Sequence, residues 1–111
     1  MARGDYLGEF ELVVLLGLAR LEEEAYGVSV YEEIERVTGR DVTIPAVYVT
    51  LSRLEKKGFV ASRVADADDT GGRARKYYRP TGQGLSSLEL SRSMLNRLFR
   101  GVRLDATPNE L

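Results

Sequence analysis

Apolar residues recur every three or four positions between residues 7 and 21, which predicts an amphipathic helix there. Most residues between them are also apolar, so this helix needs cover on most of its sides. One side can pack against its own domain, and a second subunit is the simplest cover for the other. The alternative is a central helix wholly buried within one chain. The first apolar stripe consists of Leu7, Phe10, Val14, Leu18 and Leu21.

A second helix is expected at residues 28–38, after the acidic turn at 22–24. Val30, Ile34 and Val37 have the spacing of a buried stripe. Gly39 follows the last turn, where glycine commonly ends a helix in the left-handed conformation.

A third helix is expected at residues 44–57, closed by Gly58. Thr43 is a good N-cap, and Pro45 falls in the first turn, where its missing N–H costs nothing. Two helices joined by a short turn are typical of a helix-turn-helix. The inward stripe of the third helix is Val47, Leu51 and Leu54.

Residues 59–65 and 73–79 are rich in strand formers, and a polar loop ending in two glycines separates them. Pro80 should stop the second strand. Because side chains alternate across a strand, Tyr78 and Tyr77 should point to opposite faces, and we expect Tyr78 to be the core residue. A hairpin directly after a helix-turn-helix predicts a winged helix.

A last helix is expected from residue 83 or 84 to about 101, with Thr81 as its cap. The predicted fold class is therefore mostly α with a small β-hairpin: a winged helix-turn-helix (residues 1–80) plus a C-terminal dimerisation helix and frayed tail (residues 81–111). The residues expected to meet a second subunit are Phe10, Val13, Leu16, Leu88, Leu95, Leu98, Phe99 and Val102.

The chain of 111 residues has no cysteine and no histidine. This composition excludes disulfides and removes the commonest zinc ligands and the usual nucleophile–base pairs of acyl transfer. We therefore expect neither an enzyme nor a metal or cofactor site. No apolar run reaches the ~18 residues needed to span a bilayer, and the N-terminal residues do not resemble a signal peptide. The expected location is the cytoplasm.

Charge is unevenly distributed, although the net charge is only −1. Residues 1–39 hold three basic and nine acidic side chains, whereas residues 40–82 hold nine basic and five acidic ones. A basic recognition helix and wing indicate double-stranded DNA as the partner. The alternatives are an ordinary solvated face, or a winged helix that binds an acidic protein. The candidate DNA contacts are Thr43, Tyr48, Thr50, Ser52, Arg53, Lys56, Lys57, Arg73, Arg75 and Lys76.

The acidic cluster Asp66, Asp68 and Asp69 lacks the spacing and the later Glu of an EF-hand calcium loop. A solvated turn is the better interpretation.

Three segments together carry a family resemblance: Ala-Tyr-Gly at 25–27, the pattern Tyr-x-x-Leu-x-Arg-Leu-Glu-x-x-Gly from residue 48, and Arg-Lys-Tyr-Tyr-Arg at 75–79 ahead of Thr-x-x-Gly. With them, residues 7–84 resemble the PadR family of bacterial transcription regulators, in its short-tailed branch with a single C-terminal helix. The resemblance implies a homodimeric winged helix, usually a repressor, that binds an inverted-repeat operator. It also implies phosphate contacts from Tyr26 and Ser29.

The chain departs from the family pattern at two places. Pro45 and Ala46 stand where many members have Gly-Thr at the start of the recognition helix, so a hydroxyl contact is lost. The operator preference of other family members therefore cannot be transferred to this chain. Some short-tailed members hold planar drugs between aromatic rings, but Phe99 is the only aromatic residue of the last helix here. An unknown small-molecule effector stays open as a further partner, and the sequence does not identify it.

Overall fold

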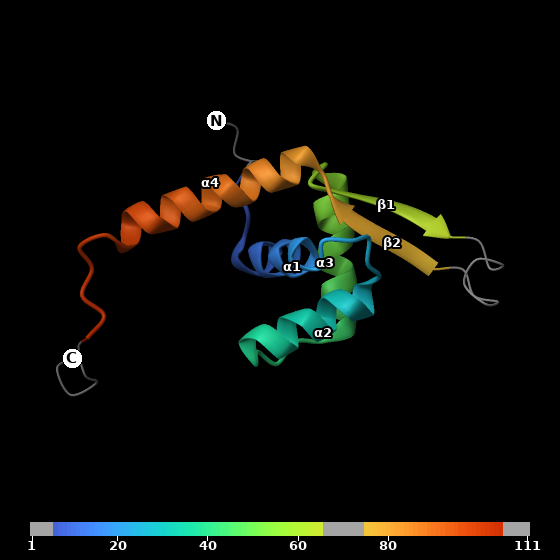
Figure 1. Ribbon diagram of the computed structural model, residues 1–111, viewed down its shortest axis with the longest axis horizontal. Helices are drawn as coiled ribbons and strands as arrows, with labels where there is room; N and C mark the ends of the chain where they lie inside the picture. Colours follow the sequence, from blue (N-terminus) through green and yellow to red (C-terminus); the bar gives the residue numbers. More distant parts are fainter. Residues whose placement is uncertain (1–5, 66–74, 106–111) are drawn as a thin grey trace.

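The computed structural model describes residues 6–65 and 75–105 (Figure 1). Three helices are followed by an antiparallel hairpin and a long final helix, as the sequence predicts. The elements are α1 (Glu9–Arg20), α2 (Gly27–Thr38), α3 (Ile44–Lys56), β1 (Val60–Ala65), β2 (Arg75–Pro80) and α4 (Gly82–Phe99).

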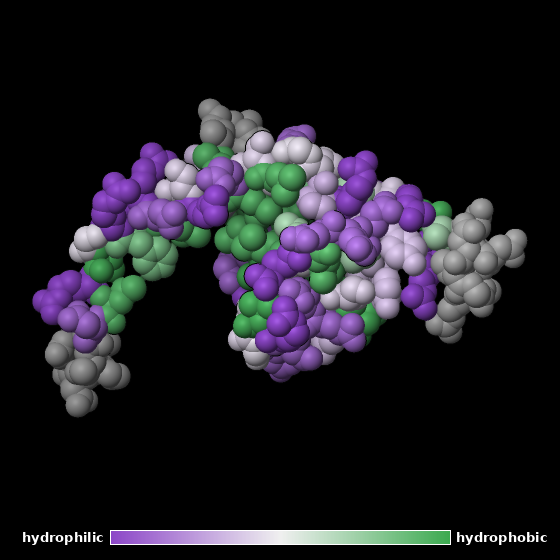
Figure 2. Space-filling view, viewed as in Figure 1, coloured by the Kyte–Doolittle hydropathy of each residue, from purple (hydrophilic) through white to green (hydrophobic). Residues whose placement is uncertain are grey.

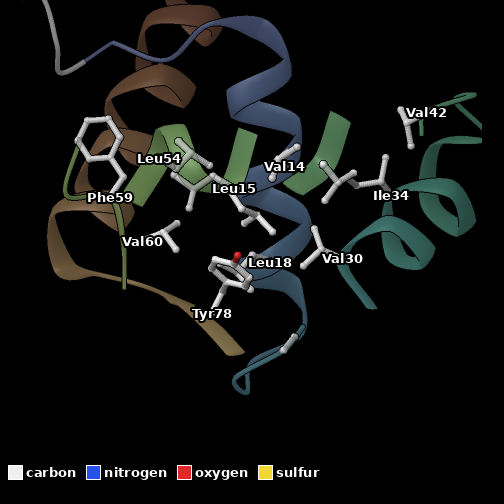
Figure 3. Packing of buried hydrophobic residues seen from close by; sticks show 13 residues of the cluster. Val14, Leu15, Leu18, Val30, Ile34, Val42, Leu54, Phe59, Val60 and Tyr78 are labelled. Atoms are coloured by element: carbon white, nitrogen blue, oxygen red, sulfur yellow. The ribbon is translucent and has the colours of Figure 1, made fainter. Parts of the chain in front are cut away.

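One apolar core lies where α1, α2, α3 and the base of the hairpin meet (Figure 3). α1 contributes Val14, Leu15 and Leu18, all with no exposed surface. The predicted inward stripe of α3 is buried, and Tyr78 reaches the core from β2 with 2% of its surface exposed. The prediction that Tyr78 is the core tyrosine is confirmed.

α1 is not covered on all sides by its own chain. Leu16 is 45% exposed, and Leu12 and Val13 are half-buried. The alternative of a central helix wholly buried within one chain is therefore wrong. The open side of α1 faces the groove beside α4.

Local capping follows the sequence closely. The Thr43 hydroxyl accepts a hydrogen bond from the Ala46 amide at 3.2 Å, and Gly39 ends α2 with φ = 66°.

The predicted buried stripe of α2 is wrong at one position, because Val37 is 45% exposed. α1 and α2 approach closely at Gly17, where an added Cβ would lie 2.9 Å from the Ile34 side chain, and Val37 lies one turn beyond this approach.

The hairpin pairs Val60 with Pro80 at its base and Ala65 with Arg75 at the last described pair. Pro80 is thus the final residue of β2, consistent with its predicted role as a stop. Ala25 forms a single β-bridge with Tyr78, in which the two N···O distances are 3.0 and 2.8 Å. This bridge ties the α1–α2 turn to the wing.

α4 begins in a fixed position and then leaves the body of the molecule (Figure 1). Thr81 caps it by accepting a hydrogen bond from the Gly84 amide at 3.0 Å, and the Thr81 hydroxyl donates to the Gly58 carbonyl at 2.7 Å. Only glycine fits at position 84, because an added Cβ would lie 2.1 Å from the Phe59 carbonyl oxygen. The Thr-x-x-Gly motif therefore anchors α4 on the α3–β1 connection.

Candidate nucleic-acid interface

The outer face of α3 carries four exposed side chains on one surface. Val49, Ser52, Arg53 and Lys56 line a shallow depression there, and we call these four residues the reading face. Their spacing of three and four residues places them on the side of the helix opposite the buried stripe. Val49 is 58% exposed.

The two cations of the reading face, Arg53 and Lys56, make no close ion pair among the described residues. Within residues 6–65 and 75–105, neither Arg53 nor Lys56 makes an ion pair, although most other cations of the three-helix body do. Unpaired cations on a convex helix are suited to phosphates or base edges.

Thr50 does not belong to this surface. It is 4% exposed, so the prediction that it points outward is wrong. Thr50 follows Val47 by three residues and precedes Leu54 by four, which places it on the buried side of the helix.

Lys57, at the C-cap of α3, is engaged elsewhere. Its Nζ lies 2.7 Å from the Glu11 carboxylate, whose other oxygen accepts a hydrogen bond from the Gly8 amide at 2.8 Å. Burial raises the pKa of Glu11, but the hydrogen bonds from Lys57 and Gly8, together with the charges of Lys57 and Arg53, outweigh it, and the pKa lies below its usual value. Lys57 therefore fastens α3 to the start of α1 instead of extending the reading face.

Tyr48 sits beside the reading face with 36% of its surface exposed. Its ring packs directly on Gly27, where an added Cβ would lie 2.4 Å from the ring. The glycine of the Ala-Tyr-Gly motif is therefore required for the fit between α2 and α3. The contact of Gly27 with the recognition helix was not predicted, and the Ala-Tyr-Gly motif at residues 25–27 was the signal in the sequence that could have indicated it.

Tyr26, the residue before α2, holds the hairpin through its ring. The ring meets Tyr77 edge to face, with centroids 6.2 Å apart, and the Arg75 guanidinium lies 4.8 Å from the Tyr26 centroid. The Arg63 guanidinium lies 5.1 Å from the centroid of the Tyr77 ring and 2.7 Å from the Glu24 carboxylate. Tyr26 thus orients Arg75, a predicted DNA contact.

Lys76 points to the opposite side of the hairpin. Its Nζ lies 3.4 Å from Glu55 of α3 and 5.5 Å from the centroid of the Tyr78 ring. The hydroxyl of Ser62 and the charge of Lys76 lower the pKa of Glu55. Lys76 therefore braces the wing against α3.

The remaining candidates are placed as follows. Thr43 is exposed at the start of α3, and its hydroxyl can still donate a hydrogen bond. Ser29 is half-buried in the first turn of α2. Arg73 lies outside the described residues, as does the acidic cluster Asp66, Asp68 and Asp69.

A second surface lies on the far side of the body from the wing. Leu12 and Leu16 of α1 face Leu85, Leu88, Leu95 and Phe99 of α4 across a mostly apolar groove of about 550 Å³, which we call the α1–α4 groove (Figure 2). Beyond it, Leu98 is 65% exposed and Val102 53%. Phe10 and Val13, also predicted for subunit contact, pack partly against the core of their own chain.

The groove also contains an ion pair that was not predicted, although Arg92 interrupts the apolar stripe of the last helix in the sequence. Arg92 and Glu89, which pair with each other on α4, line the groove together with the apolar residues.

None of the described helices is long and apolar enough to cross a membrane. Within the same described ranges, no three acidic side chains are grouped so that they could hold a metal ion.

Comparison with known proteins agrees with this geometry. The family model of the PadR-like transcriptional regulators matches residues 15–90. An uncharacterised protein X of Lysinibacillus sphaericus is 34% identical over 91 residues, covering 79% of this chain and 80% of that protein.

Solved structures show the same fold. A PadR family regulator of Eggerthella lenta is 30% identical, with a TM-score of 0.68 over 84% of this chain and 81% of that one. A PadR family regulator of Clostridium difficile superposes with a TM-score of 0.69 at 21% identity, over 83% and 95% of the two chains. The winged helix, its motifs and the family match agree: this chain belongs to the PadR-like family of transcriptional regulators.

Proposed function

We propose that the protein is a homodimeric repressor that binds an inverted-repeat DNA operator. The observation that carries the proposal is the reading face, where Arg53 and Lys56 stand unpaired among the described residues beside the exposed Val49 and Ser52. A recognition helix of this kind enters the major groove, and its cations neutralise phosphates. Such a regulator works where the chromosome is, so we place the protein in the cytoplasm.

The α1–α4 groove supports the homodimer. Exposed leucines and Phe99 form a contiguous apolar surface of the kind that marks protein–protein interfaces, and α4 projects from the body of the molecule, where a second copy can pack on it (Figure 1). A twofold dimer presents two reading faces in opposite orientation, which is the symmetry of an inverted repeat.

Selection of binding sites from a random duplex pool tests DNA recognition. We expect an enriched inverted repeat, bound with an affinity that falls steeply as salt rises. A pool with no enriched sequence contradicts sequence-specific binding. An enriched motif that is a single, unpaired half-site contradicts the symmetric dimer.

Repression needs its own test. The selected operator is placed over the promoter of a reporter gene, and expression is measured with and without the protein. Reduced expression is expected, and increased expression would identify an activator. Adding Arg53→Ala protein provides the matched control, because its α1–α4 groove is intact.

A further inference from the structure

The outer side of α3 changes character along its length. In its N-terminal half, Ile44 is 37% exposed, Val49 is 58% exposed, and Pro45 is exposed as well. Near the C-terminal end stand Arg53 and Lys56. Pro45 and Val49 are four residues apart, so they share one side of the helix with Arg53.

An apolar side chain on a DNA-reading surface is complementary to an apolar group of the DNA. The residues of a recognition helix that reach base edges are those near its N-terminal end. Among the groups on the floor of the major groove, the C5-methyl of thymine is the apolar one. Thr50 cannot supply a polar alternative, because it is 4% exposed and faces the core.

We propose that Val49, assisted by Pro45, recognises the methyl group of one thymine in each operator half-site, while Arg53 and Lys56 bind the flanking phosphates or a neighbouring purine edge. This inference rests on the proposed function and adds its base specificity. In a twofold dimer the two valines would read two thymines related by the symmetry of the operator.

Uracil substitution tests the contact at the level of a single methyl group. Each thymine of the selected operator is replaced in turn by deoxyuridine, which removes only the C5-methyl. We expect binding to weaken about fourfold at one thymine per half-site, the effect of about one buried methyl or methylene group. Thymines outside the reach of the reading face should show no change.

The Val49→Ala variant assigns the methyl to its partner. This variant should lose affinity for the thymine operator and no longer distinguish thymine from uracil at the sensitive position. Val37→Ala is the matched control, because Val37 is also an exposed helical valine, at 45%, but lies on α2. It should keep the full uracil effect.

The outcomes separate the two proposals. If no operator is enriched in the selection, sequence-specific binding itself fails. If an operator is bound tightly but no uracil substitution weakens it, methyl recognition is overturned and DNA binding stands. If Val49→Ala remains as sensitive to uracil as the unchanged protein, the methyl is read by another residue and the assignment to Val49 is overturned.

Discussion

The reading face and the α4 surface both leave large apolar side chains in water, and they differ in extent and in their neighbours. On the reading face, Val49 stands alone among Ser52, Arg53 and Lys56. On α4, apolar residues continue from the α1–α4 groove to the end of the helix, and Arg92 in that groove is neutralised by Glu89.

This difference separates two kinds of partner. A small apolar spot bordered by cations that make no ion pair among the described residues is complementary to the floor and the phosphate walls of a DNA groove. A broad apolar strip with a neutralised charge is complementary to another protein surface, and most simply to the same strip on a second copy. Exposure alone would not have distinguished them.

The largest effect should come from the α4 surface. Phe99→Asp places a charge on a side chain that is 56% exposed in the single chain. We expect the mass measured by light scattering to fall to that of one chain, 12.4 kDa. Affinity for the inverted repeat should fall on the order of 100-fold or more, because the second half-site is no longer linked to the first.

Ser93→Asp is the control for this change. Ser93 is an exposed residue of the same helix that lines the depression on its other side, with Phe59 and Leu90. It should leave mass and affinity nearly unchanged. A Phe99→Asp protein that remains dimeric would show that α4 does not form the interface.

A second prediction compares two cations at the end of α3. Arg53→Ala should weaken operator binding by about 1–3 kcal/mol and reduce the salt slope by about 0.9, with little change in stability. Lys57→Ala should lower the stability measured by urea unfolding, because it leaves the 8% exposed Glu11 carboxylate without its cation. Equal losses of DNA affinity in both variants would contradict the division between reading face and anchor.

Local rules predicted much of this fold from the sequence. The caps at Thr43 and Thr81, the end of α2 at Gly39 and the core position of Tyr78 all depend on neighbours within a few residues. Arg53 and Lys56 were also predicted to face outward, because their spacing from Leu51 and Leu54 sets them on the other side of the helix.

The errors and omissions depend on contacts between distant segments. Thr50 lies at the border of the inward stripe, so the packing of α3 against its neighbours decides whether it is covered. Lys57 and Glu11 are 46 residues apart, and no local pattern predicts their ion pair. Periodicity also predicted an apolar stripe on α4, but not that its second half would project away from the chain's own core.

The third prediction concerns the connection between the two surfaces, since α1 lines the groove and Glu11 joins it to α3. Glu11→Gln keeps an acceptor for Gly8 but removes the charge that pairs with Lys57. We expect a loss of about 1–2 kcal/mol in the free energy of unfolding at pH 7. Because the folded-state pKa of Glu11 is lowered, its contribution is present above the unfolded pKa of about 4.5 and disappears as pH falls through the folded value.

Urea unfolding at pH 7 and at pH 3.5 checks this sign. The difference between the variant and the unchanged protein should shrink at the lower pH. Glu9→Gln is the control, because Glu9 also pairs with an arginine, Arg40, but on an exposed surface, and its replacement should have the smaller effect. A difference that grows as pH falls would contradict the ion pair as the source of stability.

The smallest effect tests whether the wing belongs with the reading face. Tyr26→Leu removes the ring that orients Arg75, whereas Tyr26→Phe keeps the ring and removes only the hydroxyl. If the ring acts through Arg75, Tyr26→Leu should weaken operator binding a few-fold, the size of an exposed cation–π contact of about 0.5–1 kcal/mol, and Tyr26→Phe should not. In an Arg75→Ala background the leucine change should have no further effect on fluorescence-anisotropy titrations. The opposite outcome is a loss of operator affinity that is as large with Tyr26→Phe as with Tyr26→Leu. It would assign the effect to the Tyr26 hydroxyl, as expected for a direct hydrogen bond to a phosphate. Tyr26 itself would then be part of the DNA-binding surface.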